Sequence, residues 1–176
     1  MSTTKAQILY YSAEQASPLG SLRLLATARG LCWFAYGEDD PTFHSNWTKR
    51  HPAGNIESAS AHPVLTQVKA YLNGRLKHIS AEIDWLWTTP FQAEVYRAVL
   101  AVPYGETRTY GEIAAQIGRP RTARAVGAAN GANPLPIIIP CHRLVGADGS
   151  LRGYGGIGGI KTKQWLLDLE KANKAG

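Results

Sequence analysis

The sequence predicts two units, an α/β domain in residues 1–88 and a mostly α-helical domain in residues 89–176. Short apolar runs separated by turn-forming residues dominate the first half and are typical of strands, with one helical period among them. From Thr89 onward, helix-capping patterns introduce a series of helical segments instead. With 176 residues and 44% hydrophobic content, the chain has enough apolar material for one or two packed cores.

The α/β domain is expected to hold a small antiparallel sheet and one helix. Residues 18–36 read as a β-hairpin with a turn at 28–30, and Cys32 is a packed residue of its second strand. Residues 63–73 have helical spacing and end at an Asn-Gly pair, whereas the alternation over 79–87 predicts a half-buried strand. The polar segment 37–60 receives no assignment.

Capping patterns define the helices of the second half. Thr89 and Gln92 form one capping box, with proline at the first helical position, and Thr109 and Glu112 form another. We expect helices that start at residue 90 and stop near 103, and that span about 110–117, 121–130 and 161–173. The second and third are joined by a tight glycine-containing turn, which is the outline of a helix-turn-helix.

Residues 137–143 place Cys141 and His142 side by side at the end of an apolar segment. Ile139 precedes a proline, which favours extended backbone, and three consecutive isoleucines indicate burial. A thiol there is either a small buried hydrophobe or a nucleophile. Ionising an ordinary cysteine at neutral pH costs about 2 kcal/mol, so a reactive Cys141 needs a base, and His142 is the first candidate.

Charge and cysteine content narrow the class of protein. A net charge of +6 and a pI near 9.4 favour an anionic partner, nucleic acid first. The chain has two cysteines, too few for a disulfide framework or a cysteine-rich zinc site. Residues 1–11 lack the apolar core of a signal peptide, and no stretch approaches the length of a membrane span. We therefore expect a cytoplasmic protein with no membrane partner.

Three further segments suggest binding surfaces. Residues 122–129 are almost all small and carry Arg124 in the middle, which suits close approach to DNA better than packing in a core. The glycine-rich segment 153–159 suggests a pocket wall whose backbone can approach a ligand. Glu170 borders the apolar stripe of the last helix, where it is either an ordinary solvated glutamate or a group that orients a histidine.

The second half resembles the O6-alkylguanine-DNA alkyltransferases, a family of direct-reversal repair proteins. The resemblance is carried by short motifs in a fixed order across residues 89–170. They are Thr-Pro-Phe-Gln at 89–92, Tyr-Gly-Glu at 110–112, Ala-Arg-Ala-Val-Gly at 123–127, Asn-Pro at 133–134, Pro-Cys-His-Arg at 140–143, Gly-Tyr at 153–154 and Leu-Leu-Asp-Leu-Glu at 166–170. The first half resembles the family's ribonuclease H-like N-terminal domain chiefly at residues 17–20.

This resemblance implies catalytic roles for four residues. Cys141 would accept the alkyl group, His142 would act as its base through a bridging water, and Glu170 would orient the imidazole. Asn133 would serve as the hinge between the recognition helix and the active-site loop. Cys141, His142 and Glu170 would thus form the general arrangement of a nucleophile, its base and a group that orients the base.

The resemblance also implies a DNA-binding surface and a base pocket. Arg124 would fill the gap left by an extruded base, and Tyr110 would crowd the target's phosphate and then contact the guanine. Tyr154 would wall the pocket, with Gly155 and Leu144 contributing backbone groups that read the base. Further DNA contacts are expected at Gln92, Gly111, Arg119, Arg121, Ala123 and Gly127.

The implied activity is a single-turnover transfer of an alkyl group from O6-alkylguanine in DNA, and also from O4-alkylthymine, to Cys141. The base would be flipped through the minor groove, and no cofactor or metal would take part. The implied partner is double-stranded DNA bound by a monomer, with cooperative binding along DNA left open. Two alternatives remain: a module that binds alkylated DNA without transfer, and a cysteine hydrolase.

Overall fold

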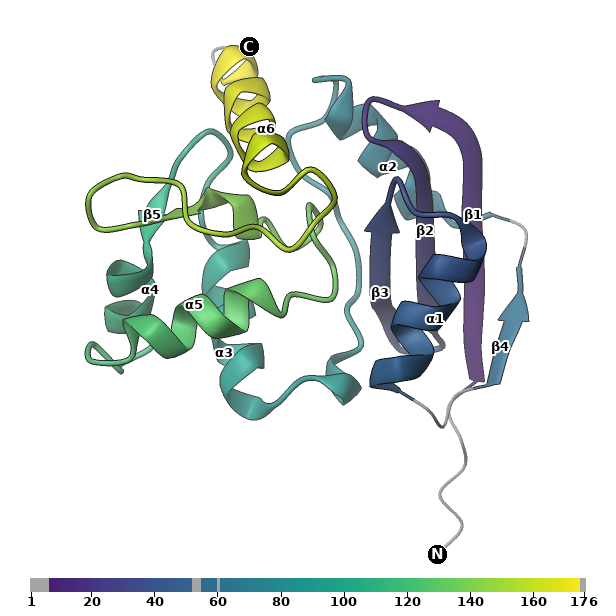
Figure 1. Cartoon of the computed structure of the whole chain (residues 1–176), viewed down its shortest axis with the longest axis horizontal. Coiled ribbons are helices and arrows are strands. Elements are labelled where there is room, and N and C mark those ends of the chain that lie inside the picture. Colours follow the sequence, from purple (N-terminus) through teal and green to yellow (C-terminus); the bar gives the residue numbers. More distant parts are fainter. Residues whose placement is uncertain (1–6, 52–54, 60, 175–176) are drawn as a thin grey trace, which may run out of the picture.

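Two units lie side by side in the computed structural model of the chain, which describes residues 7–51, 55–59 and 61–174 (Figure 1). The N-terminal unit is a sheet with helices, and the C-terminal unit is mostly helical. The expectation of a mixed α/β protein is therefore confirmed. Among the described residues, none of the helices has the length and apolar character needed to cross a lipid bilayer.

The N-terminal unit is built on a four-stranded sheet in the order β3-β2-β1-β4. Its strands are β1 (Gln7–Ser17), β2 (Gly20–Thr27), β3 (Gly30–Tyr36) and β4 (Asn55–Ser58). The predicted hairpin corresponds to β2 and β3. The expected antiparallel sheet holds for β1, β2 and β3, but it was wrong for β4, which follows α1 and pairs in parallel with β1.

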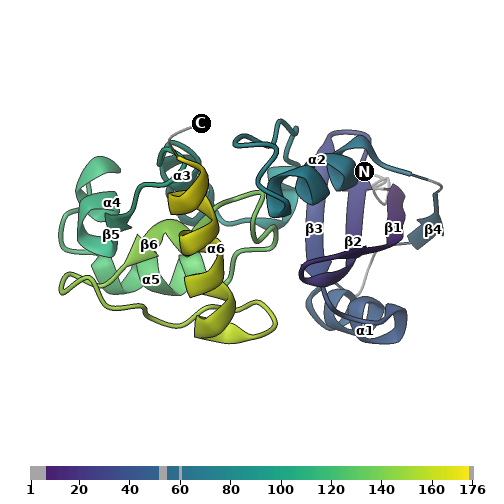
Figure 2. The ribbon, with the colours of Figure 1, turned by 90° about the horizontal axis from the view of Figure 1, so that it is seen from above.

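Two helices cover the opposite faces of this sheet (Figure 2). One is α1 (Asp40–Arg50), which lies in the unassigned polar segment and begins at the Asp39 cap. The other is α2 (Pro63–Leu72), at the place the helical spacing predicted. Both use a proline in the first turn, where a missing N–H costs no hydrogen bond.

The predicted strand over 79–87 was wrong. Ile83 alone forms a bridge, with Leu31 of β3, and the chain then turns into the short 3₁₀ helix η1 (Trp85–Trp87). The turn has a local cause, because the Asp84 side chain accepts the backbone N–H of Leu86 and caps the helix. The alternation of apolar residues continues past that cap, but the backbone is no longer extended there.

The C-terminal unit contains four α-helices among the described residues. They are α3 (Pro90–Leu100), α4 (Tyr110–Gln116), α5 (Ala123–Gly131) and α6 (Gly159–Asn173). Shorter elements are the parallel pair β5 (Arg108–Thr109) and β6 (Leu144–Val145) and the 3₁₀ turn η2 (Cys141–Arg143). Both predicted capping boxes form, and α4 packs against α5 across the intervening turn.

One buried cluster joins the two units. It runs from the α2 side of the sheet, through α2, to α3, α5 and the segment that precedes Cys141. A second, smaller cluster fills the space between the sheet and α1. Because the larger cluster is shared, the edge of the sheet at β3 is held in place beside the C-terminal unit.

Candidate active site

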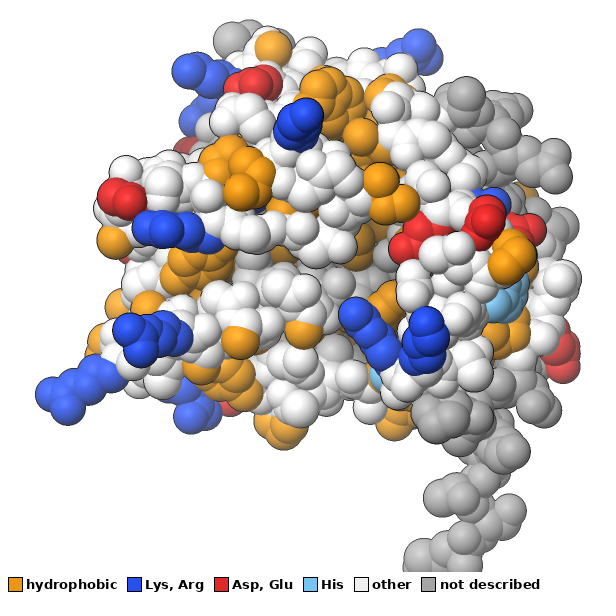
Figure 3. Space-filling view, viewed as in Figure 1, with side chains coloured by type: hydrophobic (Ala, Val, Ile, Leu, Met, Phe, Trp, Pro, Cys, Tyr) orange, Lys and Arg blue, Asp and Glu red, His pale blue; other side chains and the backbone are white. Residues whose placement is uncertain are grey.

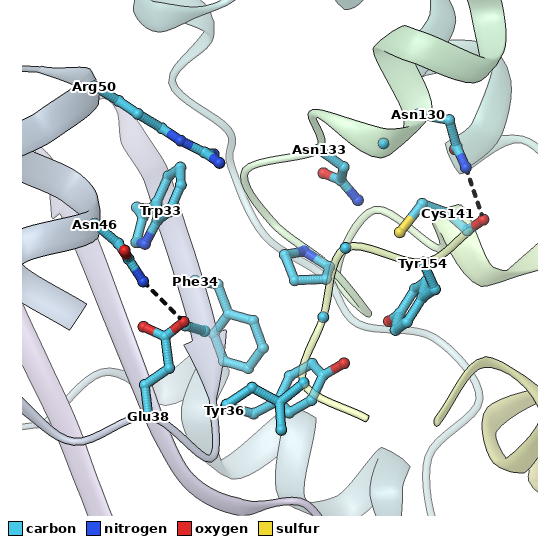
Figure 4. A pocket seen from close by; sticks show the side chains of 16 residues that line it. Trp33, Phe34, Tyr36, Glu38, Asn46, Arg50, Asn130, Asn133, Cys141 and Tyr154 are labelled. Carbon is cyan, nitrogen blue, oxygen red and sulfur yellow. Dashed lines mark hydrogen bonds between the residues drawn. The ribbon is translucent and has the colours of Figure 1, made fainter. Parts of the chain in front are cut away.

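A pocket of about 170 Å³ lies between the edge strand β3 and the loops of the C-terminal unit (Figure 4). Cys141 lines it together with Asn133, Tyr154 and Gly155. The sequence analysis placed Tyr154 and Gly155 at the pocket but expected Asn133 only as a hinge. The N-terminal unit supplies the opposite wall, which sequence reasoning missed; its side chains include Trp33, Phe34, Tyr36, Glu38, Asn46 and Arg50. Figure 4 shows the Cys141 sulfur and the Asn133 amide on the side of the pocket opposite Trp33 and Arg50.

The edge of β3 is closed by the chain segment that leads to the cysteine. The backbone N–H of Phe34 donates to the carbonyl of Pro134 at 2.8 Å. This bond pairs a group that an edge strand would otherwise expose. The bond therefore fixes the Asn133–Pro134 corner against the sheet, next to the pocket.

The apolar segment before Cys141 is buried, as predicted, but it is not extended. Ile137 has a φ of 74°, a left-handed conformation that a β-branched residue rarely adopts and that costs about 1–3 kcal/mol. Asn133 braces the turn, because its Nδ2 donates to the Ile139 carbonyl at 2.9 Å and its Oδ1 accepts the Leu135 N–H at 3.0 Å. The bracing holds the strained backbone beside the sulfur.

Cys141 is buried and rests as a thiol. Burial raises the pKa of Cys141, and hydrogen bonds from the Asn133 side chain and the Ile137 N–H, with the charge of Lys163, act against that rise. The other cysteine, Cys32, lies in the sheet, where burial raises its pKa to about 12. Only Cys141 therefore has groups around it that stabilise a thiolate once the proton is removed.

His142 and Glu170 form a hydrogen-bonded pair in the interior. Their Nε2 and Oε1 atoms are 2.7 Å apart, and both side chains are fully buried. Burial acts to raise the pKa of Glu170, but hydrogen bonds from His142 and Arg143 outweigh it and bring that pKa to about 2. Burial lowers the pKa of His142 more than the carboxylate raises it. The pair is thus a carboxylate and a neutral imidazole.

The tautomer of His142 follows from this pairing. An ionised carboxylate only accepts hydrogen bonds, so Nε2 carries the hydrogen and Nδ1 keeps a free lone pair. Nδ1 is buried and has no hydrogen-bond partner among the described residues. The imidazole is therefore prepared to take a proton at the nitrogen that Glu170 does not occupy.

The carboxylate of Glu170 is held by more donors than the sequence suggested. The Nε of Arg143 lies 3.0 and 3.1 Å from its two oxygens, and the Gly105 N–H donates to Oε2 at 2.7 Å. Tyr71 of α2 donates its hydroxyl to Oε1. Arg143 stands beside the Pro-Cys-His motif and was a visible candidate, whereas no local signal marks Tyr71 as more than a core residue.

Lys163 is a second group that sequence reasoning missed. It is fully buried on α6, and its Nζ donates to the Arg152 carbonyl at 3.2 Å and lies 5.9 Å from the ring centroid of Tyr110. It makes no ion pair with any residue in the described part of the chain. Burial lowers its pKa, against the opposing influence of Cys141. A cation kept in the interior without a carboxylate favours negative charge on the nearby sulfur.

The other predicted substrate residues lie near the pocket but differ in access. Tyr110 starts α4 outside the pocket lining, with its ring against Gly127 of α5. Leu144 is fully buried in β6. A Cβ on Gly156 would lie 1.9 Å from the Tyr36 hydroxyl, so any other residue where this loop approaches β3 would displace the Tyr36 side chain.

The predicted DNA-binding residues spread over one end of the C-terminal unit. Arg124, Arg121 and Gly111 are exposed, and Ala123 and Gly127 are partly exposed. Arg119 forms an ion pair with Glu94, with Nε and Oε2 3.1 Å apart, and the Gln92 side chain closes the capping box of α3. In Figure 3, Lys and Arg side chains project from the left edge of the molecule, where α4 and α5 lie in Figure 1.

A buried thiol followed by an imidazole that is hydrogen-bonded to a carboxylate is the set of groups expected around a nucleophilic cysteine. Comparisons with known proteins identify the family. The sequence model of the 6-O-methylguanine DNA methyltransferase DNA binding domain matches residues 90–172. A methylated-DNA–protein-cysteine methyltransferase of Methanosarcina barkeri is 40% identical over 167 residues, covering 94% of this chain and 99% of the relative. The chain therefore belongs to the methylated-DNA–protein-cysteine methyltransferase family.

Mycobacterial proteins are more similar over a shorter span. The methyltransferase of Mycobacterium tuberculosis is 58% identical over 106 residues, which are 60% of this chain and 62% of that protein. A crystal structure of the M. tuberculosis O6-methylguanine methyltransferase superposes with a TM-score of 0.76 at 41% identity, covering 95% of this chain and 94% of that one. A second crystal structure, of the M. tuberculosis protein in complex with DNA, has the same TM-score at 42% identity and covers 94% of each chain.

Proposed function

We propose that this protein repairs O6-alkylguanine in double-stranded DNA by moving the alkyl group irreversibly onto Cys141. One observation carries the proposal: the buried Cys141 thiol lines a pocket and is followed directly by His142, whose ring is held 2.7 Å from Glu170. The printed names of the relatives, which act on methylated DNA and a protein cysteine, support the same chemistry.

The proposed step is an in-line displacement at the alkyl carbon. The thiol proton passes through a bridging water to Nδ1 of His142, because adjacent side chains seldom hydrogen-bond directly. The sulfur then forms the new S–C bond while the C–O6 bond breaks and its electron pair leaves with the guanine oxygen. Tyr110 and the Gly155 N–H would stabilise this charge. The guanine takes up one proton from solvent while His142 releases the proton it accepted, so the products are S-alkylcysteine and normal guanine. O4-alkylthymine presents the same bond and is the second expected substrate.

DNA would be bound through α5 and the start of α4, in the minor groove. The target carbon lies inside the base stack, so the nucleotide must be extruded at a cost of a few kcal/mol. Arg124 is exposed on α5, among small residues that permit close approach, and its side chain would occupy the space left by the base. The protein would act as a monomer, with no cofactor or metal, and one protein molecule would be consumed for each lesion repaired.

A single assay tests this function. The protein is incubated with a duplex oligonucleotide that contains O6-methylguanine, then digested and analysed by mass spectrometry. We expect one methyl group on the Cys141 peptide, stoichiometric with protein, and none on the Cys32 peptide. Cys141→Ala should bind the same duplex without transfer. A stable complex without transfer by the unaltered protein would indicate a binding module, and repeated turnover on another substrate would indicate a hydrolase; either result contradicts the proposal.

A further inference from the structure

Tyr71 brings a hydroxyl from the N-terminal unit into contact with both members of the His142–Glu170 pair. It lies on α2 and is 2% exposed. Its Oη is 3.2 Å from His142 Nε2, and its hydroxyl is hydrogen-bonded to Glu170 Oε1. These three atoms form a closed triangle inside the protein, with one corner contributed by a different unit from the other two.

The direction of each hydrogen bond in the triangle is fixed. Glu170 is ionised and only accepts, so the Tyr71 hydroxyl donates to Oε1. The Nε2–H of His142 points at the same oxygen and leaves the Tyr71 oxygen as a longer, secondary acceptor. Rotation of the carboxylate or a flip of the imidazole would leave a buried donor without a partner, which is costly.

We propose that Tyr71 is a positioning residue, which holds His142 and Glu170 in the orientation that leaves Nδ1 free to deprotonate Cys141. This inference rests on the alkyl transfer proposed above and deepens it, since formation of the thiolate then depends on contact between the two units. Ionised Glu170 and Arg143 face the Tyr71 hydroxyl, and Tyr104 lies edge-on to its ring at 5.8 Å between centroids. Burial raises the pKa of Tyr71, so its hydroxyl keeps its hydrogen.

Tyr104 offers a matched comparison. Its hydroxyl is also buried but has no hydrogen-bond partner among the described residues. Replacing either tyrosine by phenylalanine therefore removes a hydroxyl group from one of two neighbouring rings. The Tyr71 hydroxyl contacts the His142–Glu170 pair, whereas the Tyr104 hydroxyl does not. A purely structural role for Tyr71 as a core ring would make the two variants behave alike.

The test measures thiolate formation without DNA. The unaltered protein, Tyr71→Phe and Tyr104→Phe are treated with iodoacetamide over a range of pH, and labelling of each cysteine peptide is followed by mass spectrometry. In Tyr71→Phe we expect Cys141 labelling at neutral pH to slow about tenfold and its midpoint to move to higher pH. Tyr104→Phe should follow the unaltered protein. Cys32 is buried in the sheet and should stay unlabelled throughout. Labelling of Cys32 would therefore indicate that the fold has loosened.

Two results would overturn the inference. One is a Tyr71→Phe profile that superimposes on that of the unaltered protein; the other is a parallel rise in Cys32 labelling, which would trace the effect to the fold. Nitrogen-15 NMR of the His142 ring adds an independent readout: a single Nε2-protonated tautomer should become a mixture in Tyr71→Phe, and an unchanged spectrum also overturns it. Because iodoacetamide needs no DNA, failure of methyl transfer from DNA by the unaltered protein would reject the proposed function separately.

Discussion

The Nε2 atom of His142 lies 2.7 Å from Oε1 of Glu170, and neither side chain is exposed to solvent. This contact decides which imidazole nitrogen carries the hydrogen and which one remains available as a base. It also keeps a carboxylate charged in the interior, where Arg143 and the Gly105 N–H share its stabilisation. The proposed deprotonation of Cys141 and the pH dependence of folding are consequently linked through the same two side chains.

Acid should destabilise the protein in two stages. The folded-state pKa of His142 is lowered, so the unfolded chain binds a proton first and stability falls as pH drops below about 6.5. The pKa of Glu170 is lowered from 4.5 to about 2, so its contribution is full above pH 4.5 and is lost as pH falls toward 2. That second contribution is about 3 kcal/mol. Urea unfolding at a series of pH values measures both stages.

Glu170→Gln isolates the second stage of this acid response. The variant should be less stable at pH 7, because Arg143 loses its buried partner, yet its stability should change less between pH 4.5 and 3. Glu82→Gln, at an exposed position, should reproduce the original curve. Equal slopes for the Glu170 variant and the unaltered protein in this range would rule out the assigned role.

Asn133→Asp should make Cys141 harder to ionise. Asn133 donates to the Ile139 carbonyl and stabilises the sulfur, so a carboxylate there opposes both the turn and the thiolate. We expect iodoacetamide labelling at neutral pH to fall about tenfold, with the midpoint displaced upward. Asn46→Asp places a carboxyl group at the far wall of the pocket, beside Glu38, and serves as the control. Comparable losses in both variants would show a general charge effect on the pocket.

Local signals predicted α2 to α6 because the information for these helices lies within a few neighbouring residues, whereas α1, in the polar segment, was not predicted. Thr89 with Gln92, and Thr109 with Glu112, satisfy each other's backbone groups wherever the helix later packs. The missed strand β4 depends on parallel pairing with the distant β1, which no window of sequence contains. The other missed strand, β1, pairs with its neighbour β2 through a tight turn and is a local hairpin that the sequence analysis did not extend to. The false strand over 79–87 shows the reverse problem, since an apolar alternation does not reveal where Asp84 turns the chain.

The site residues likewise fall into those that the sequence reveals and those that only the packing of the two units brings to the site. The adjacency of Cys141 and His142 is visible in the sequence, and the family resemblance pointed to Glu170, which the structure brings to the same place. The Tyr71 hydroxyl is 99 residues away from Glu170 along the chain, and its position on the apolar face of α2 resembles that of any core tyrosine. The wall contributed by β3 was equally hidden, because it depends on how the two units pack.

Loss of the capping box at Thr109 should act on both stability and repair. Thr109→Ala leaves the Glu112 N–H without its acceptor, which should reduce the free energy of unfolding by about 1 kcal/mol. Tyr110 directly follows the cap, so repair of duplex DNA should slow as well. Asp39→Ala removes the N-cap of α1 in the N-terminal unit, which carries no predicted DNA-contacting residue. Denaturant titration and single-turnover repair assays should show similar stability losses but a slower rate only for the Thr109 variant.

Arg124→Ala should separate base extrusion from alkyl transfer. Arg124 is exposed and belongs to no ion pair among the described residues, so the variant should unfold like the unaltered protein. Repair of a duplex needs an extruded base and should slow about tenfold or more, whereas transfer from the free modified base needs no extrusion and should keep its rate. Arg75→Ala, exposed in the N-terminal unit, removes the same charge and controls for general attraction to DNA. An equal loss on duplex and free base would mean that Arg124 acts on the pocket itself, and a loss matched by Arg75→Ala would reduce its role to charge.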